Sequence, residues 1–122
     1  MDKTVNSAHD RRDYDVKIER GYVTLEVGDV IVHVHVPSFM KMLAELGLAR
    51  NWTEGFALLV ELINFAYKAT KTYHNNTEKA IEYMLKLFCG VAVPYHPTRK
   101  YYMVMQCMNM LRNCIRIVRL DQ

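Results

Sequence analysis

The feature that most constrains this chain is an abrupt change in the spacing of its apolar residues at Pro37. Between Tyr14 and Val36, apolar and polar residues alternate, so each set lies on one face of a β-strand. From Pro37 onward, apolar residues recur every three or four positions, which is typical of an amphipathic helix. Most strands and helices are separated by a loop of several residues, so a join this tight is a designed feature of the fold.

The alternating region divides into three predicted strands. The dipeptides Arg20-Gly21 and Gly28-Asp29 interrupt the alternation, and a glycine in a two-residue turn supplies the positive φ that hairpins need. The sequence therefore predicts a three-stranded antiparallel meander with a valine-rich buried face and a polar face. The preceding residues, 1–13, are polar and of mixed charge. We interpret them as a flexible arm ahead of a single domain that spans residues 14–122.

Four helices are predicted after the meander. Pro37 suits the first turn of the first helix, and Gly47 suits the position just past its end. The second helix is apolar on most sides and is expected to be the central, most buried one. Thr53 and Thr77 are the predicted N-caps of the second and third helices. The fold class is therefore α+β, with helices covering the apolar face of the sheet.

The second and third helices are expected to end near Tyr73 and at Gly90, and the fourth to run from about Thr98 to Leu120. Three arginines of this fourth helix, Arg112, Arg116 and Arg119, are spaced to lie on one side. A guanidinium group can donate to two phosphate oxygens at once, so the stripe suits a nucleic-acid backbone. The alternative is a solvated helix face whose cations complement the C-terminal dipole.

Composition and charge narrow the classes of function. The chain has 122 residues, which suits one domain with one core, and the longest apolar run is too short for a membrane span of about 20 residues. No signal peptide is visible, and the three cysteines are not spaced as a metal site, so we expect reduced thiols in the cytoplasm. Residues 97–122 carry five basic side chains against Asp121, so a polyanion should prefer the C-terminal end.

His33 and His35 occupy the polar face of the third predicted strand. Two imidazoles at this spacing can chelate a metal if a third ligand, such as Asp29 or His96, joins them. The simpler interpretation places both on a solvated sheet face, and we predict no metal. No nucleophile stands beside a base in a catalytic pattern, and no glycine-rich phosphate loop is present. We therefore predict no enzyme activity, no cofactor and no small-molecule substrate.

The eight methionines include a dense group in the fourth predicted helix. Methionine gives soft, adaptable packing, and one small domain offers limited surface to cover all of these side chains. An ordinary core explains any single methionine, but the set as a whole indicates self-association through an apolar patch.

The segment that passes from His33 and His35 through the first helix to the start of the second resembles a ribbon-helix-helix DNA-binding unit. The resemblance covers residues 30 to about 68, a third of the chain. It implies an obligate dimer whose strands pair across the dimer axis and place Ile31, His33 and His35 in the DNA major groove. It also implies a phosphate contact at Trp52, Thr53 and Glu54, with Arg50 and Asn51 in the preceding turn.

Two functions follow from these patterns. The first is a small dimeric DNA-binding regulator that uses either the strand and helix-start residues or the C-terminal arginines. The second is a non-catalytic oligomer, an adaptor or structural subunit that acts through a protein interface.

Overall fold

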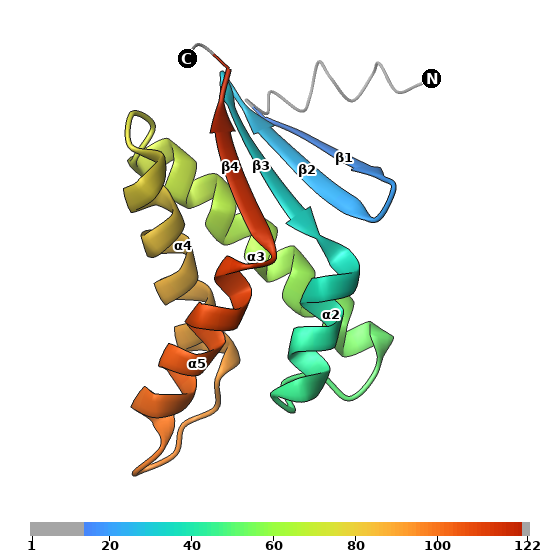
Figure 1. The fold of residues 1–122 in the computed structure, drawn as a ribbon, viewed down its shortest axis with the longest axis vertical. Helices are drawn as coiled ribbons and strands as arrows, with labels where there is room; N and C mark the ends of the chain where they lie inside the picture. The colour runs from blue at the N-terminus through green and yellow to red at the C-terminus, as the bar shows by residue number, and fades with distance from the viewer. Residues whose placement is uncertain (1–13, 121–122) are drawn as a thin grey trace.

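The computed structural model describes residues 14–120, and the predicted arm of residues 1–13 lies outside them. A four-stranded antiparallel sheet and four helices make an α+β fold (Figure 1). The elements in chain order are β1 (Asp15–Glu19), β2 (Tyr22–Val27), β3 (Val30–His35), α2 (Val36–Glu45), α3 (Trp52–Thr72), α4 (Thr77–Ala92), α5 (Lys100–Arg112) and β4 (Ile115–Arg119).

The predicted meander is confirmed. β1 pairs antiparallel with β2, and β2 with β3, through the two turns that the sequence marked. Arg20 and Gly21 both have positive φ, at 54° and 82°, as a tight hairpin turn of the mirror-image type requires. Alternate residues of β2 and β3 are buried against the helices, beginning with Val23 and Leu25 in β2 and with Val30 in β3.

The C-terminal segment is a strand, and the prediction of a helix to Leu120 was wrong. α5 ends at Arg112, and residues Ile115–Arg119 form β4, which pairs antiparallel with β3. The sheet order is therefore β1-β2-β3-β4, so the C-terminal strand closes one edge of the N-terminal meander. Side chains three positions apart on a strand project from opposite faces of the sheet. Arg116 and Arg119 therefore lie on opposite faces and do not form a stripe with Arg112.

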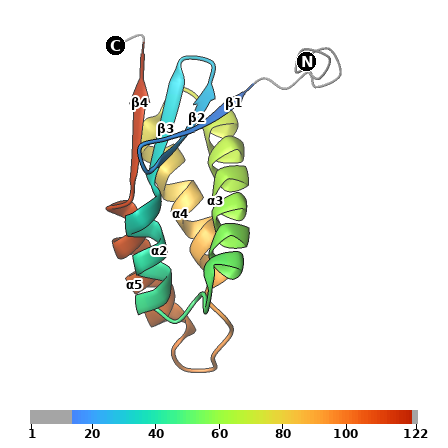
Figure 2. The ribbon, with the colours of Figure 1, turned by 90° about the vertical axis from the view of Figure 1, so that its right-hand side faces the viewer.

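The molecule is built in two layers, which Figure 2 shows from the side. One layer holds the sheet together with α2 and α5, which continue below β3 and β4 and pack against each other. The second layer is the antiparallel pair α3 and α4, which lies behind the sheet. The outer face of the sheet, on the side away from α3 and α4, carries no helix among the described residues.

The tight join at Pro37 follows from this layered plan. The helix α2 starts directly after His35, with Pro37 in its first turn where a missing N–H costs nothing. The backbone N–H of His35 donates to the carbonyl of Cys114 at 2.9 Å, and that of Val36 donates to the carbonyl of Gly21 at 2.8 Å. These bonds tie the junction to both neighbouring strands, so β3 and α2 form one continuous support.

The core lies between the layers and is almost wholly apolar. The rings of Phe39 in α2 and Phe88 in α4 are both buried, with centroids 5.7 Å apart. The central helix is α4, which packs against α3, α5 and β4. The expectation that the second helix is the most buried was wrong, because one side of α3 exposes Trp52, Phe56 and Val60.

The N-caps of α3 and α4 are asparagines and not the predicted threonines. The side chain of Asn51 accepts from the backbone N–H of Glu54 at 2.9 Å, and that of Asn76 accepts from Lys79 at 3.1 Å. Thr53 is already inside α3, and α4 continues past Gly90 to Ala92. At the other end of α2, Gly47 takes the predicted position after the helix, with φ of 69°.

Candidate nucleic-acid interface

The outer face of the sheet brings together residues that are far apart in sequence. In the strand register, Tyr22 lies opposite His35, Thr24 opposite His33, and His33 opposite Arg116. Residues that pair directly across strands project from the same face of the sheet. We call these five residues the outer-face cluster. Three of them, His33, His35 and Arg116, are predicted binding residues that the fold unites on this one surface.

Contacts within the cluster orient its rings. Thr24 Oγ1 lies 3.2 Å from Nδ1 of His33, and the Oγ of Ser38 lies 2.6 Å from Nδ1 of His35. The ring centroid of Tyr22 is 4.9 Å from that of His35 and 6.3 Å from that of His33. Tyr22 is nevertheless 42% exposed, so part of this residue remains open to solvent on the sheet face.

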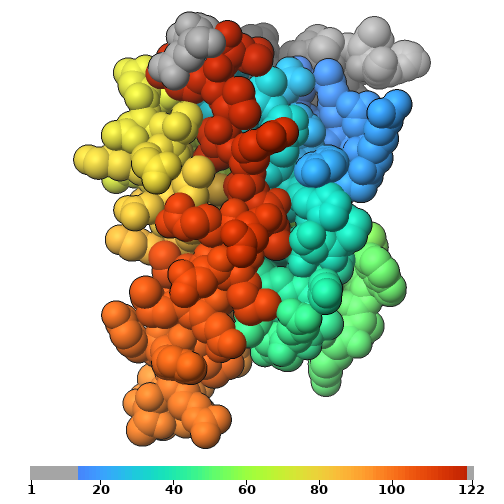
Figure 3. Space-filling model, in the orientation of Figure 1, coloured from blue at the N-terminus to red at the C-terminus, as the bar shows by residue number. Residues whose placement is uncertain are grey.

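Two shallow hollows adjoin on this face and share Tyr22, His33 and Arg116. One, of about 380 Å³, also includes Glu19, Arg20 and Thr24. The other, of about 280 Å³, extends past His35 to the turn between α5 and β4. Figure 3 shows the outer surface over β4, β3 and β2, which is formed by segments from both ends of the chain.

The three C-terminal arginines have different surroundings. Within residues 14–120, Arg116 is exposed and its guanidinium forms no ion pair or hydrogen bond. Arg119 faces the helix side of the sheet, where Nη2 lies 3.2 Å from Oδ2 of Asp29, which also meets His74. Arg112 is exposed at the end of α5 and lies outside both hollows. Of the predicted stripe, only Arg116 belongs to the outer-face cluster.

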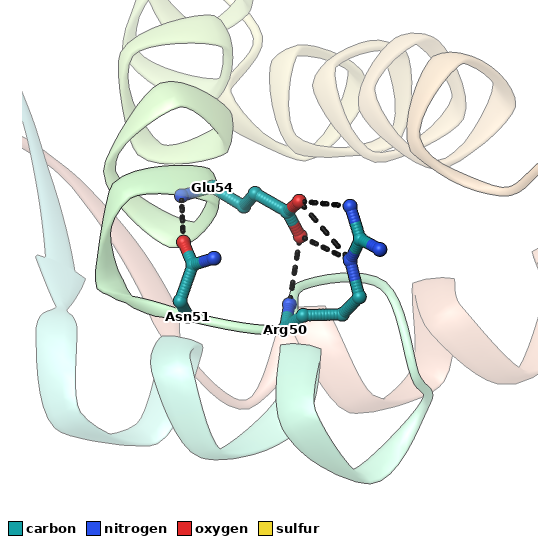
Figure 4. Close-up of polar contacts among 3 residues, drawn as sticks. All are labelled: Arg50, Asn51 and Glu54. Atoms are coloured by element: carbon teal, nitrogen blue, oxygen red, sulfur yellow. Dashed lines mark hydrogen bonds and ion pairs between the residues drawn. The ribbon is translucent and has the colours of Figure 1, made fainter.

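The predicted phosphate contact at the α2–α3 turn is occupied by the chain's own side chains (Figure 4). Glu54 accepts from the backbone N–H of Arg50 at 2.8 Å and from its Nη2 at 2.7 Å. The hydrogen bond from Arg50 holds the pKa of Glu54 below its ordinary value, and the same contact raises the pKa of Arg50. Asn51 caps the N–H of Glu54. A carboxylate therefore stands where an anion would bind.

A groove of about 500 Å³ lies beside this turn, between α2 and the start of α3. Its wall is largely apolar, with Pro37, Met40 and Trp52 among the lining residues, and Lys41 and Arg50 are its basic residues. Trp52 is exposed and packs against Phe56, with ring centroids 5.6 Å apart. Thr53 is exposed but does not line the groove. The surface at this turn is therefore mainly apolar, with little unpaired positive charge among the described residues.

The strand arrangement differs from the one that the ribbon-helix-helix resemblance implies. In such a dimer the ribbon strand pairs with the same strand of a second chain. Here β3 pairs with β2 on one side and β4 on the other, so neither of its edges is open to a partner. His33 and His35 remain on the outer face, but as part of a four-stranded sheet.

In the part of the chain that the structure describes, no three His, Cys, Asp or Glu side chains gather as a metal site. None of the described helices is both long and apolar enough to cross a membrane. Family models, characterised proteins and solved structures were all compared with this chain, and none of them matches it.

Sequence reasoning missed Tyr22 as a site residue and placed Arg116 on the wrong element. The signal for Tyr22 was present, because the alternation puts it on the polar face of β2 beside Thr24. The position of Tyr22 opposite His35 depends on the register of the β2–β3 hairpin. Its position near Arg116 depends on the pairing of β3 with β4, two strands whose paired residues are more than eighty positions apart in sequence. No local sequence pattern predicts that Tyr22 and Arg116 line the same hollows.

Proposed function

We propose that this protein binds single-stranded nucleic acid on the outer face of its sheet. The observation that carries the proposal is the outer-face cluster, in which an exposed Tyr22 and two imidazoles lie near the Arg116 guanidinium, which is unpaired within residues 14–120. Aromatic and imidazole rings on a protein surface stack on unpaired bases, and a nearby arginine contacts the backbone phosphates. The two adjoining hollows provide room for neighbouring bases.

The dimensions of the sheet favour a single strand over a duplex. A two-stranded ribbon fits the DNA major groove, which is about 12 Å wide. Four strands spaced about 4.8 Å apart span roughly 14 Å between the outer backbones alone. We therefore propose that bases lie on the open sheet, in place of the predicted insertion of a ribbon into the major groove.

Charge is distributed unevenly over this face. The β1 and β2 half carries Asp15, Glu19 and Glu26, of which Glu26 pairs with Lys17 at 3.4 Å. The β3 and β4 half carries Arg116 and the two histidines and has no carboxylate among the strand residues that face outward. A nucleic-acid backbone should therefore lie along β3 and β4 and avoid the β1 edge.

Fluorescence anisotropy with a labelled single-stranded oligonucleotide tests this proposal. Arg116→Ala should weaken binding and lower the slope of log affinity against log salt by about 0.7. Tyr22→Ala should cost about 1–3 kcal/mol of binding energy, the amount typical of one stacked base. The matched control is Arg50→Ala, which removes an arginine that is also exposed but is paired, and it should leave the affinity nearly unchanged.

Three outcomes would contradict the proposal. These are no binding at about 50 mM salt, equal losses in Arg116→Ala and Arg50→Ala, or a duplex bound more tightly than the single strand. RNA and DNA oligonucleotides of the same sequence should be titrated side by side, because a role for the 2′-hydroxyl would separate the two.

Self-association is a second candidate, and the edge strand β1 favours it. β1 pairs only with β2 in the described chain, so its other edge has free backbone groups. Ile18 projects from the helix-facing side of the sheet yet is 77% exposed. If two β1 strands pair antiparallel about Ile18, Lys17 of one protomer lies opposite Glu19 of the partner subunit. The methionines that suggested this property are mostly covered, because Met105 is the only exposed one in the described chain.

Molar mass in solution tests the second candidate. Light scattering at micromolar concentration should give a dimer, and Ile18→Asp should give a monomer. Val118→Asp is the control, because Val118 is a partly exposed residue on the opposite edge strand. A monomeric wild-type chain, or a dimer that Ile18→Asp leaves intact, would contradict the β1 interface.

A further inference from the structure

Two buried cysteines meet where α4 and α5 pack together. The Sγ atoms of Cys89 and Cys107 lie 2.8 Å apart, and both side chains are fully buried. They come from different helices, eighteen residues apart in sequence. Neither residue contributes to the outer-face cluster or to the α2–α3 turn, so this contact is independent of the binding surfaces described above.

The ends of the two helices are held in place close to this pair. The Nζ of Lys100, at the start of α5, donates to the carbonyl of Gly90 at 2.8 Å and also to the carbonyl of Val93. These bonds join the first turn of α5 to the last turn of α4. The thiols are thus brought together by a fixed helix pair and not by a mobile loop.

We propose that Cys89 and Cys107 are an oxidisable dithiol that forms a disulfide between α4 and α5 when the protein meets a peroxide. A disulfide has an S–S distance of about 2.05 Å, so the two sulfurs need to approach by less than about 1 Å. The helices α4 and α5 keep the same packing neighbours in this step.

The chemistry proceeds in two balanced steps. The thiolate of Cys107 attacks hydrogen peroxide, the O–O bond breaks, and a sulfenic acid and hydroxide form. The thiol of Cys89 then attacks that sulfur and water leaves, so the two thiols lose two electrons that reduce peroxide to water. We assign the first attack to Cys107 because it accepts the hydrogen bond from Cys89, which lowers its pKa, whereas that hydrogen bond, burial and the neighbouring charge raise the pKa of Cys89. Attack by Cys89 would give the same bridge, so the proposal depends on the distance between the two sulfurs and not on the order of attack.

Cys114 provides an internal control. It is also buried, but its thiol faces the backbone carbonyl of Met110 at 3.7 Å and no cysteine lies within hydrogen-bond reach of its sulfur in the described residues. If oxidation requires two neighbouring thiols, Cys114 should stay reduced. If it requires only a buried thiol, all three cysteines should be oxidised alike.

Intact-mass analysis of the folded full-length chain tests the proposal. After treatment with hydrogen peroxide, quenching, denaturation and alkylation, the chain should have lost the mass of two hydrogen atoms and taken up a single alkyl group. Peptide mapping should locate the bridge between Cys89 and Cys107. Cys114→Ser should form the same bridge and take up no alkyl group, whereas Cys107→Ser should form none.

Thermal unfolding supplies a second readout that needs no variant. A bridge across the 18 residues that separate Cys89 from Cys107 should raise the melting temperature by about 5–10 °C, and a thiol reductant should reverse the rise. The proposal is overturned by a bridge that includes Cys114, by three alkylated cysteines after treatment, or by a bridge that forms only after unfolding. A melting temperature that falls on oxidation would equally overturn it, because the folded helix pair would then not fit the bond.

Discussion

The outer sheet face and the α2–α3 turn both hold residues that the sequence marks for nucleic-acid binding, yet the fold treats them differently. At the turn, Arg50 is paired with Glu54 and the helix start is capped by Asn51. On the sheet, Arg116 is exposed beside two histidines and a tyrosine, with no ion pair among the described residues. A cationic side chain is therefore available to a ligand only where the fold has placed no carboxylate against it.

The same contrast recurs within one strand. Arg116 and Arg119 both belong to β4, but they project from opposite faces. Arg119 contacts Asp29 and Asn75 and is largely covered, so it joins the end of the sheet to the α3–α4 turn. One arginine is therefore held by contacts within the fold, while the other, three residues earlier, is exposed and has no ion pair within residues 14–120.

Loss of the α2 core residue that supports both regions should destabilise the protein most. Phe39 is fully buried in α2, the helix that links β3 to the α2–α3 turn, and it packs against Phe88. Phe39→Ala should lower the free energy of unfolding by about 3–5 kcal/mol because it leaves a cavity. Urea denaturation followed by circular dichroism measures this loss.

Phe56→Ala is the matched control for that experiment, because Phe56 is half exposed on α3. It should cost well under half as much, since little buried surface is lost. Equal destabilisation by the two variants would mean that the core does not lie where the layers place it.

A smaller effect should separate the turn from the sheet face. Asn51→Ala removes the N-cap of α3 and should lower the free energy of unfolding by about 1 kcal/mol. The affinity of the folded protein for a single-stranded oligonucleotide should not change, because the proposed binding surface is the sheet face and not the turn. Asn64→Ala, at an exposed position in the middle of the same helix, is the control and should not destabilise. Weaker oligonucleotide binding by Asn51→Ala would mean that the α2–α3 turn belongs to the binding site.

The smallest effect concerns the carboxylate at the turn. Because Arg50 lowers the pKa of Glu54 in the folded state, the pair contributes stability above the ordinary glutamate pKa. That contribution is lost as the pH falls through the lowered value. Carbon-detected NMR titration should place the Glu54 midpoint below the ordinary glutamate value, and Arg50→Ala should raise it. Unchanged midpoints in the variant would show that the ion pair does not persist in solution.

Much of the fold was readable from the sequence because it depends on local patterns. The alternation between Tyr14 and Val36 predicted three strands, and the glycines marked their turns. Pro37 and Gly47 predicted both ends of α2. The threonine caps were wrong although the sequence held the better choice, because Asn51 has a glutamate three residues later and asparagine is the stronger N-cap.

The fourth strand could not be recognised with the same ease. The segment from Ile115 to Arg119 alternates in a strand-like way, but its arginines also have the spacing of a helix face. Its assignment as a strand depends on pairing with β3, whose residues lie more than eighty positions earlier. The same holds for the candidate site: the positions of the two histidines were predicted from alternation, but the strand pairing that places His33 opposite Arg116 was not.

The most direct test maps the bound oligonucleotide on the folded protein by amide and imidazole NMR shifts. Addition of a short single-stranded oligonucleotide should shift the signals of Tyr22, His33, His35 and Arg116 together and leave those of Arg50 and Glu54 in place. Shifts centred on the start of α3, or no shifts at a saturating concentration in low salt, would contradict binding at the open sheet face.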